Sequence, residues 1–161
     1  MAELATGHLK GVTNGAALVL GSGLGGGIII NGKLFQGSHF QAGELTFLLP
    51  LQMEKLDPSL MQETTLSAIG LITKVNEILA SLDLKDGLLA FKAINAKKEA
   101  VYPIFETYCR NLAITILNLQ TIFDMETFVL GGGISAQSIL IEEVNRQFDK
   151  VHHEIDFIGK I

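Results

Sequence analysis

Apolar runs separated by glycine-rich turns predict a β-meander in the first third of the chain. Ala16–Leu20 is an apolar run that ends at glycine, and Gly27–Ile30 is a second one. Asn31-Gly32 follows and precedes Lys33–Phe35, and an Asn-Gly pair between apolar runs is typical of a two-residue hairpin turn. We therefore expect antiparallel strands with tight turns, and then a loop region over Gly37–Pro50.

Helical spacing replaces this pattern in the middle of the chain. A broad apolar face with helical periodicity predicts a helix over Leu60–Leu82. A shorter helix is expected over Asp86–Ile94, with Asp86 as its N-cap. Apolar residues recur three, four and seven positions apart from Val101 to Phe123, which predicts a long amphipathic helix.

The last part of the chain predicts a strand, a glycine turn and a helix. Thr127–Leu130 is a short β-favouring run, and Gly131–Gly133 follows it directly. Ser135 is a suitable N-cap for a helix that continues to about Lys150. A further strand is expected over Ile155–Ile158. Together these elements predict an α/β fold.

Composition and charge limit the classes of protein. The 161 residues suffice for one ordinary domain, and 48% apolar against 18% charged residues is typical of a folded globular protein. A net charge of -5 without a cluster of Lys or Arg argues against nucleic-acid binding within this chain. No apolar run could span a membrane, and the first residues lack a signal-peptide pattern. The single cysteine, Cys109, is expected to be a buried apolar residue, which fits a soluble protein in a reducing cytoplasm.

The first glycine run raises a choice between ligands. Gly21, Gly23 and Gly26 spell G-x-G-x-x-G, and Glu44 follows eighteen positions later. A dinucleotide fingerprint needs these glycines between a strand and a helix, whereas a hairpin follows here, and no Gly-Lys-Ser/Thr of a Walker loop is present. Two interpretations remain. One is a phosphate-binding hairpin in which backbone N–H groups converge on an anion and Ser22 adds a hydroxyl. The other is a tight turn without a ligand.

The second glycine run, Gly131–Gly133, does lie between an expected strand and an expected helix. Close approach of a ligand to the helix N-terminus is therefore physically reasonable there. A phosphate-type hairpin, then helices, then a strand–GGG–helix unit is a more specific arrangement than either glycine run alone.

These stretches resemble the ROK family (repressor, open reading frame, kinase). The matching segments are LGSGLGGGIIINGKLFQG from Leu20, AGE at Ala42–Glu44, and VLGGGIS at Val129–Ser135. The resemblance implies an actin-like ATPase fold of ribonuclease-H-like topology, with a mixed sheet, a β-meander and flanking helices. In that family two α/β domains close on sugar and nucleotide. Residues 1–161 resemble the C-terminal domain alone, so the N-terminal domain is expected to be absent from this chain.

The resemblance also implies roles for individual residues. Gly21, Ser22 and Gly23 fall on the motif that contacts ATP phosphates. Gly131 and Gly132 fall on the motif that lines the adenosine. The Glu44 carboxylate falls on the glutamate that accepts hydrogen bonds from sugar hydroxyls, which suits a group with about four lone-pair sites. Without the flanking match, a solvated loop residue is the preferred interpretation of Glu44.

The chain departs from the family pattern at the zinc site. The family often carries GEIGH followed by CxCGxxGCxE, whose histidine and three cysteines hold a structural zinc. Here GELTF places Phe47 at the histidine position, and an ungapped match places Glu54, Leu56 and Met61 at the cysteine positions. These residues cannot form a tetrahedral zinc site, so we expect no zinc. The family histidine also contacts the sugar. Phe47 at its position therefore leaves two questions open, namely which sugar is the substrate and whether the protein is a kinase.

No catalytic residue is expected in this chain. The start AELATG resembles the end of the family helix that follows the general-base aspartate, so that aspartate is expected upstream of Met1. The first phosphate motif of the family, DxGGT, is also missing. Phosphoryl transfer depends on positioning nucleophile, base and Mg-ATP between two domains. We expect this chain to be inactive alone.

Three functions remain open. The first is the C-terminal domain of an ATP-dependent hexose or N-acetylhexosamine kinase, with ATP and Mg as cofactors. The second is a sugar-sensing transcriptional repressor domain, whose DNA-binding element would precede this chain. The third is a non-catalytic sugar-binding or dimerisation module. The family resemblance further suggests a homodimer.

Overall fold

A four-stranded mixed sheet is the frame of the structure, a computed structural model that describes residues 7–48 and 65–155. The strand order is β3-β2-β1-β4, with β1 antiparallel to β2 and parallel to β4. The strands are β1 (Gly15–Leu20), β2 (Leu24–Ile30), β3 (Lys33–Phe35) and β4 (Thr127–Gly132). The expected α/β class and mixed sheet are therefore confirmed.

The predicted β-meander is present over β1, β2 and β3. Asn31 and Gly32 both have positive φ, at 53° and 71°, which is the geometry that favours an Asn-Gly turn between two strands. The turn is tied to the chain before β1, because the Gly32 N–H donates to the Thr13 carbonyl at 2.8 Å and the Asn31 N–H to Asn14 Oδ1 at 3.0 Å. The Asn-Gly pair thus forms the turn, and residues before β1 hold it in place.

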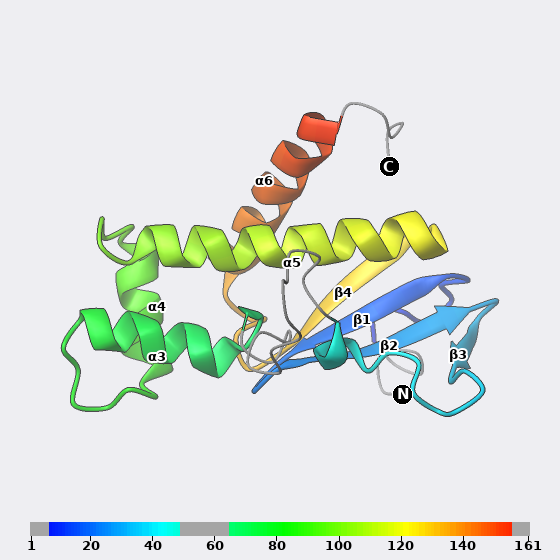
Figure 1. Ribbon diagram of the computed structural model, residues 1–161, viewed down its shortest axis with the longest axis horizontal. Helices are drawn as coiled ribbons and strands as arrows, with labels where there is room; N and C mark the ends of the chain where they lie inside the picture. The colour runs from blue at the N-terminus through cyan, green and yellow to red at the C-terminus, as the bar shows by residue number, and fades with distance from the viewer. Residues whose placement is uncertain (1–6, 49–64, 156–161) are drawn as a thin grey trace, which may run out of the picture.

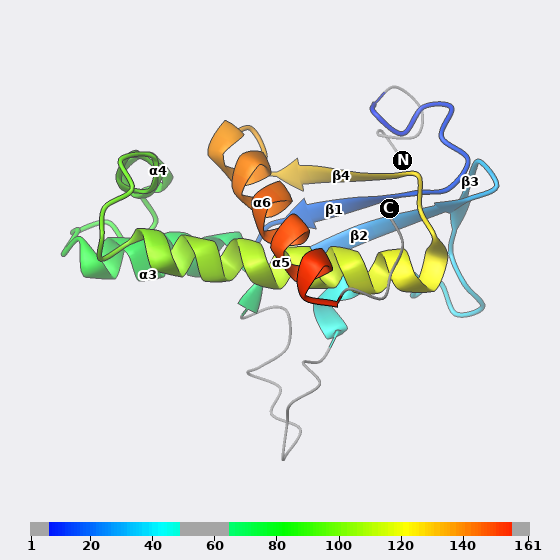
Figure 2. The same ribbon diagram turned by 90° about the horizontal axis from the view of Figure 1, so that it is seen from above.

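Helices lie on one face of the sheet and beyond one of its ends (Figure 1). The helices are η1 (Leu45–Phe47), α3 (Ala68–Ile78), α4 (Gly87–Asn95), α5 (Tyr102–Phe123) and α6 (Ser138–Ile155). In Figures 1 and 2, α5 and α6 pack together over the sheet, while α3 and α4 lie at the end where β1 and β4 point. No helix in the described ranges is long and apolar enough to cross a bilayer.

The core joins the sheet to α5 and α6. Leu18 and Leu20 of β1 pack with Leu112 of α5 and Leu140 of α6, all of them fully buried. Cys109 is also buried in this core, as predicted, and burial raises the pKa of its thiol. The predicted helices over Asp86–Ile94 and Val101–Phe123 are confirmed as α4 and α5.

The predicted helix over Leu60–Leu82 is interrupted at residues 66 and 67 and ends earlier than predicted. Residues 60–64 lie outside the described ranges, and α3 begins at Ala68 because Ser67 caps it, its Oγ accepting from the Gly70 N–H at 2.9 Å. At the other end the chain leaves the helix through Ala80, whose φ is 51°. The apolar pattern continues past both ends of α3, so it did not indicate where the helix begins and ends.

The predicted N-cap at Ser135 is wrong. Ser135 belongs to a turn before α6, where its N–H and its Oγ both donate to the Gly132 carbonyl, at 3.2 and 2.9 Å. The helix starts three residues later, at Ser138. The expected strand over Ile155–Ile158 is also wrong at its first residue, since α6 continues to Ile155, and residues 156–158 lie outside the described ranges.

Candidate functional site

The two glycine runs meet at one end of the sheet. Strands β1 and β4 are parallel, and their register pairs Leu20 with Gly132. The carboxyl ends of both strands, and the turns that follow them, are therefore neighbours although the glycine runs are far apart in the sequence. In open α/β sheets, ligands bind preferentially at such carboxyl ends.

Gly132 makes this close approach possible. Its φ is +100°, and a Cβ at this position would lie 2.2 Å from the Leu20 carbonyl oxygen. No side chain fits in that space, and L residues rarely adopt that φ. The neighbouring Gly133 differs, because a Cβ there would meet no atom within 4 Å. Gly132 is thus required by the contact between the strands, whereas Gly133 leaves open space.

Helix α3 fixes the first glycine turn. The Gly21 N–H donates to the Gly23 carbonyl at 3.0 Å, which closes the turn. The Gly21 carbonyl accepts from the Ala68 N–H at 2.9 Å and from the Ile69 N–H at 3.4 Å. These donors are the first N–H groups of α3, which have no partner within the helix itself. The N-terminus of α3 therefore sets the conformation of the turn.

The same turn keeps backbone donors available for a ligand. No residue in the described ranges accepts a hydrogen bond from the Ser22 or Gly23 N–H group, and the Ser22 side chain is exposed. A Cβ on Gly21 would meet no atom within 4 Å, so the surrounding protein does not require glycine there. Free N–H groups in a turn without bulky side chains form a suitable cradle for an anion.

A cavity of about 620 Å³ opens between the two glycine turns and the α3–α4 region. Gly21 lines it from the first turn and Gly133 from the second. Ser22 and Gly23 continue the first turn, and Gly131 and Gly132 directly precede Gly133. Apolar side chains of α3 and α4 supply one wall, and a few polar side chains complete it. These are Ile69, Ile72, Leu88 and Phe91, with Asp83, Lys85 and Gln137.

This wall has the chemistry of a small-molecule site. Such sites combine a mostly apolar lining with a few placed polar groups. An apolar surface suits the face of a planar base, and the glycine turn at its edge suits a phosphate. Sequence reasoning missed Lys85 and Gln137 because neither carries a motif. The N-cap signal of Asp86 was the available sign that a structured loop precedes α4.

Glu44 lies in a second, smaller pocket of about 510 Å³, lined by Phe40, Gln41, Glu44 and Phe47. Its carboxylate is exposed and makes no capping bond to η1. It is therefore available to a ligand. Phe47 is 63% exposed and lies beside Glu44, so an aromatic side chain occupies the pocket position where the family pattern has histidine.

A glycine contact holds the Glu44 loop against β2. Gly43 has φ +90°, and a Cβ on Gly26 would lie 2.9 Å from the Gly43 carbonyl oxygen. Gly26 follows Gly23 by three positions along β2, which is about 10 Å at the usual rise per residue of a strand. Glu44 is thus close to the first glycine turn along the sheet, but it does not line the cavity that contains Gly21 and Gly133.

An ion-pair network holds α6, the helix that follows the second glycine turn. Glu143 is only 4% exposed and accepts from Arg146 Nε at 2.9 Å, from Gln147 Nε2 at 2.7 Å and from the Tyr102 hydroxyl of α5 at 3.0 Å. Burial raises the pKa of Glu143, whereas the hydrogen bonds from these three side chains lower it. The hydrogen bonds have the larger effect, so the pKa of Glu143 lies below its ordinary value. Burial and the same carboxylate raise the pKa of Tyr102 to about 12.

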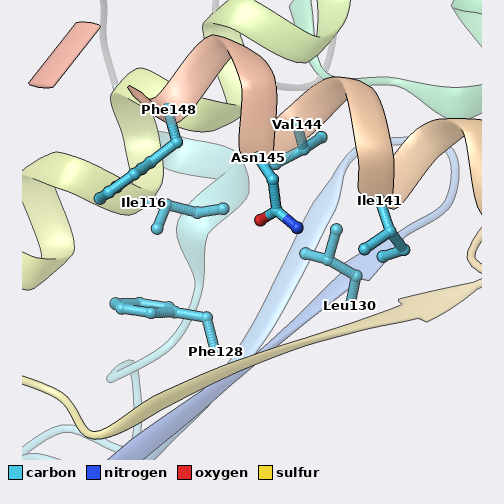
Figure 3. Close-up of a pocket in the computed structure, with 7 residues that line it drawn as sticks. All are labelled: Ile116, Phe128, Leu130, Ile141, Val144, Asn145 and Phe148. Atoms are coloured by element: carbon cyan, nitrogen blue, oxygen red, sulfur yellow. The ribbon is translucent and has the colours of Figure 1, made fainter. Parts of the chain in front are cut away.

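An apolar groove lies apart from the predicted residues. It runs between β4, α5 and α6, and its volume is about 270 Å³ (Figure 3). Phe128 and Leu130 of β4 face Ile116, Val144 and Phe148, and Asn145 is the polar side chain among the labelled residues. None of the described residues that line it is charged, so they offer no cationic partner for a phosphate.

The described ranges include one of the four family zinc positions. Phe47 is described, whereas Glu54, Leu56 and Met61 lie outside the described ranges. Within residues 7–48 and 65–155, no three His, Cys, Asp or Glu side chains are grouped to hold a metal ion.

Comparison with known proteins assigns the class and then the family. The fold, an antiparallel meander extended by a parallel strand with helices on one face, is that of the actin-like ATPases. A sequence model of the ROK family matches residues 1–154. The chain belongs to the ROK family.

Individual relatives are moderately similar. An N-acetyl-D-glucosamine kinase of Vibrio cholerae is 30% identical over 160 residues, which is 89% of this chain and 51% of that protein. A glucokinase of Halalkalibacterium halodurans is 28% identical over 169 residues, which is 92% of this chain and 50% of that protein. The chain spans about half the length of the curated relatives it matches.

Solved structures share the fold. A ROK family protein from Streptococcus pneumoniae TIGR4 in complex with sucrose superposes with a TM-score of 0.82 and 28% identity, over 93% of this chain and 51% of that chain. A ROK family transcriptional regulator, a homologue of the E. coli MLC protein, has a TM-score of 0.75 and 23% identity, over 95% of this chain and 43% of that chain. The second likeness concerns the fold alone.

Proposed function

We propose that this chain is the C-terminal, nucleotide-binding domain of an ATP-dependent sugar kinase of the ROK family. The observation that carries the proposal is the pairing of Leu20 with Gly132, which brings both glycine turns to one cavity. Kinases that act on glucose and on N-acetylglucosamine are among the relatives, so the proposed substrate is a hexose or an N-acetylhexosamine.

The nucleotide would occupy the cavity between the turns. The proposed phosphate contacts are Gly21, Ser22 and Gly23. The free N–H groups of Ser22 and Gly23 and the Ser22 hydroxyl suit phosphate oxygens, and Gly21 leaves the space beside them open. The proposed adenosine contacts are Gly131 and Gly132, together with Gly133 on the cavity wall. Bound Mg-ATP would supply the phosphoryl group, and the contribution of this chain is to bind and orient it.

The sugar would lie at Glu44. An ionised carboxylate accepts hydrogen bonds from two adjacent hydroxyls and so fixes the orientation of a sugar ring. Gly23 and Gly26 are about 10 Å apart along the strand direction. This distance leaves room for the transferred phosphate and, next to it, the sugar. Phe47 beside Glu44 replaces a polar neighbour with an aromatic face, and we propose that it influences which sugar is accepted.

The remaining parts of the kinase would come from outside this chain. The proposed general base is an aspartate in the other half of the protein, which would also close the site. We further propose a homodimer and, from the residues at the family zinc positions, a protein without structural zinc. Metal analysis of the purified protein checks the last point, since about one zinc per chain would contradict it.

A sugar-sensing repressor is the second candidate. One observation favours it, namely that the exposed Phe47 stands at the position of the family histidine that contacts the sugar. The two candidates share the sugar pocket and differ in phosphoryl transfer. A repressor would bind its sugar without releasing ADP and would bind DNA through an element outside this chain.

The test is an ADP-release assay of the whole protein with ATP, Mg²⁺ and a panel of hexoses and N-acetylhexosamines. We expect turnover with at least one sugar. A folded protein that binds a sugar but turns over none would favour the repressor, and one that binds neither sugar nor nucleotide would contradict both candidates.

A further inference from the structure

One buried amide connects α3 to the loop that precedes α4. Asn76 is 0% exposed, and its Nδ2 donates to the Leu84 carbonyl at 3.3 Å and to the Asp86 carbonyl at 3.0 Å. A side-chain amide nitrogen has two N–H donors, and both are used here. The acceptors are the two residues that flank Lys85.

The backbone of Asn76 holds the other end of the same loop. Its carbonyl accepts from the Ser81 N–H at 3.0 Å. Between these anchors the loop is ordered by short bonds, in which Asp83 Oδ1 accepts from the Lys85 N–H at 2.9 Å and the Ser81 Oγ accepts from the Asp83 N–H at 3.2 Å. Asn76 is therefore the residue through which α3 fixes the conformation of residues 81–86.

This loop is one wall of the cavity between the glycine turns. Asp83, Lys85 and Asp86 line the cavity, and Asp86 also caps α4 by accepting from the Leu89 N–H at 2.9 Å. Helix α4 in turn contributes Leu88 and Phe91. Asn76 itself does not line the cavity, so it acts on the site through the loop.

The arrangement leaves one buried acceptor unpaired. Asn76 Oδ1 is the buried side-chain N or O atom without a hydrogen-bond partner in the described part of the chain. Leaving a buried acceptor unpaired costs free energy, and such groups in a native structure call for an explanation. An amide that served only to stabilise the fold would be expected to use its acceptor as well as its two donors.

We propose that Asn76 is a positioning residue for nucleotide binding, which fixes the wall of the cavity that carries Lys85. This inference rests on the proposed function of the cavity. It goes beyond that function because it assigns the geometry of the nucleotide wall to a residue that touches no ligand. The sugar pocket at Glu44 lies on a different element, so its affinity should not depend on Asn76.

The test compares two buried amides in the whole protein. Gln120 is the matched control, because it also binds a loop, through Asp124 Oδ1 at 3.1 Å and the Met125 N–H at 3.1 Å. That loop leads into β4 at the end of the sheet away from α3 and α4 (Figure 2).

Asn76→Ala and Gln120→Ala should both lower the melting temperature. Calorimetric titration with Mg-ADP should show about tenfold weaker binding for Asn76→Ala alone. Binding of glucose or N-acetylglucosamine, whichever the wild-type protein binds, should be unchanged in both.

The outcomes separate the inference from the proposed function. Unchanged Mg-ADP affinity in a folded Asn76→Ala protein, or an equal loss of nucleotide and sugar affinity, would overturn the inference and leave the proposed function intact. A wild-type protein that does not bind Mg-ADP would overturn the proposed function first. If Asn76→Ala does not fold, Ser81→Ala decides, because it loosens the same loop without touching the core. It should weaken Mg-ADP binding severalfold, and no change there would overturn the inference.

Discussion

Leu20 and Gly132 lie opposite each other in adjacent parallel strands, so close that a Cβ on Gly132 would lie 2.2 Å from the Leu20 carbonyl oxygen. This contact brings two glycine turns, separated by most of the chain, to one cavity. The site therefore depends on the register between β1 and β4, and glycine substitutions at the two turns should have different consequences.

Gly132→Ala should destabilise the protein by at least about 2 kcal/mol, because the added Cβ meets backbone and the φ of +100° is strained for alanine. Urea denaturation measures the loss. Gly133→Ala is the control, since a Cβ there meets no atom within 4 Å. It should leave the free energy of unfolding within about 0.5 kcal/mol of wild type. Equal destabilisation by both substitutions would show that the strand contact is not the cause.

Gly21→Ala should separate binding from folding. Its φ is not in the left-handed region, and a Cβ there has open space, so the free energy of unfolding should change by less than about 0.5 kcal/mol. The added methyl group would nevertheless occupy space at the edge of the cavity. We expect weaker Mg-ADP binding by calorimetry with an unchanged melting temperature. Unchanged nucleotide affinity would remove Gly21 from the phosphate contacts.

Glu44→Gln should weaken sugar binding by about 1.5–3 kcal/mol, the range for a hydrogen bond to a charged group. Stability should be unaffected, because the Glu44 side chain is exposed and caps nothing. Calorimetric titration with the sugar identified by turnover provides the measurement. Glu99→Gln, an exposed change elsewhere on the surface, is the matched control. Identical sugar affinity in the two variants would place the sugar away from Glu44.

Stability should fall at acid pH through Glu143. Its pKa is lowered in the folded protein by the bonds from Arg146, Gln147 and Tyr102, which outweigh the effect of burial. A carboxyl with a lowered folded pKa stabilises the protein above its unfolded value, 4.5, and that contribution is lost as the pH falls through the folded pKa. Glu143→Gln should cost about 1–3 kcal/mol at pH 7.

The same substitution should also flatten the pH dependence of stability below pH 4.5. Urea denaturation at a series of pH values measures both effects. Glu142→Gln, the neighbouring exposed carboxylate, should retain the wild-type dependence. A Glu143→Gln protein with an unchanged acid slope would contradict the assigned cause.

Local signals in the sequence were sufficient for the elements they control. The Asn31-Gly32 turn, the Asp86 cap and the length of α5 were all predicted correctly, because neighbouring residues determine them. Ser135 was misassigned because a serine before a helix has two possible partners. Its hydroxyl donates to the Gly132 carbonyl instead of capping α6.

The candidate site needed information that no local pattern carries. The family motifs made Gly21 and Glu44 candidate residues, but the register that places Gly133 beside Gly21 is a contact between strands far apart in the sequence. The role of Asn76 was likewise hidden, because one polar position on an apolar helix face gives no sign of the carbonyl groups that it binds.

The most direct test of the central claim is an NMR titration of the ¹⁵N-labelled protein with Mg-ADP, following the backbone N–H signals of Ser22, Gly23 and Gly133. If both glycine turns bind one nucleotide, the signals of both turns will shift with the same dissociation constant. Shifts confined to one turn, or absent from both in a folded protein, would contradict the account.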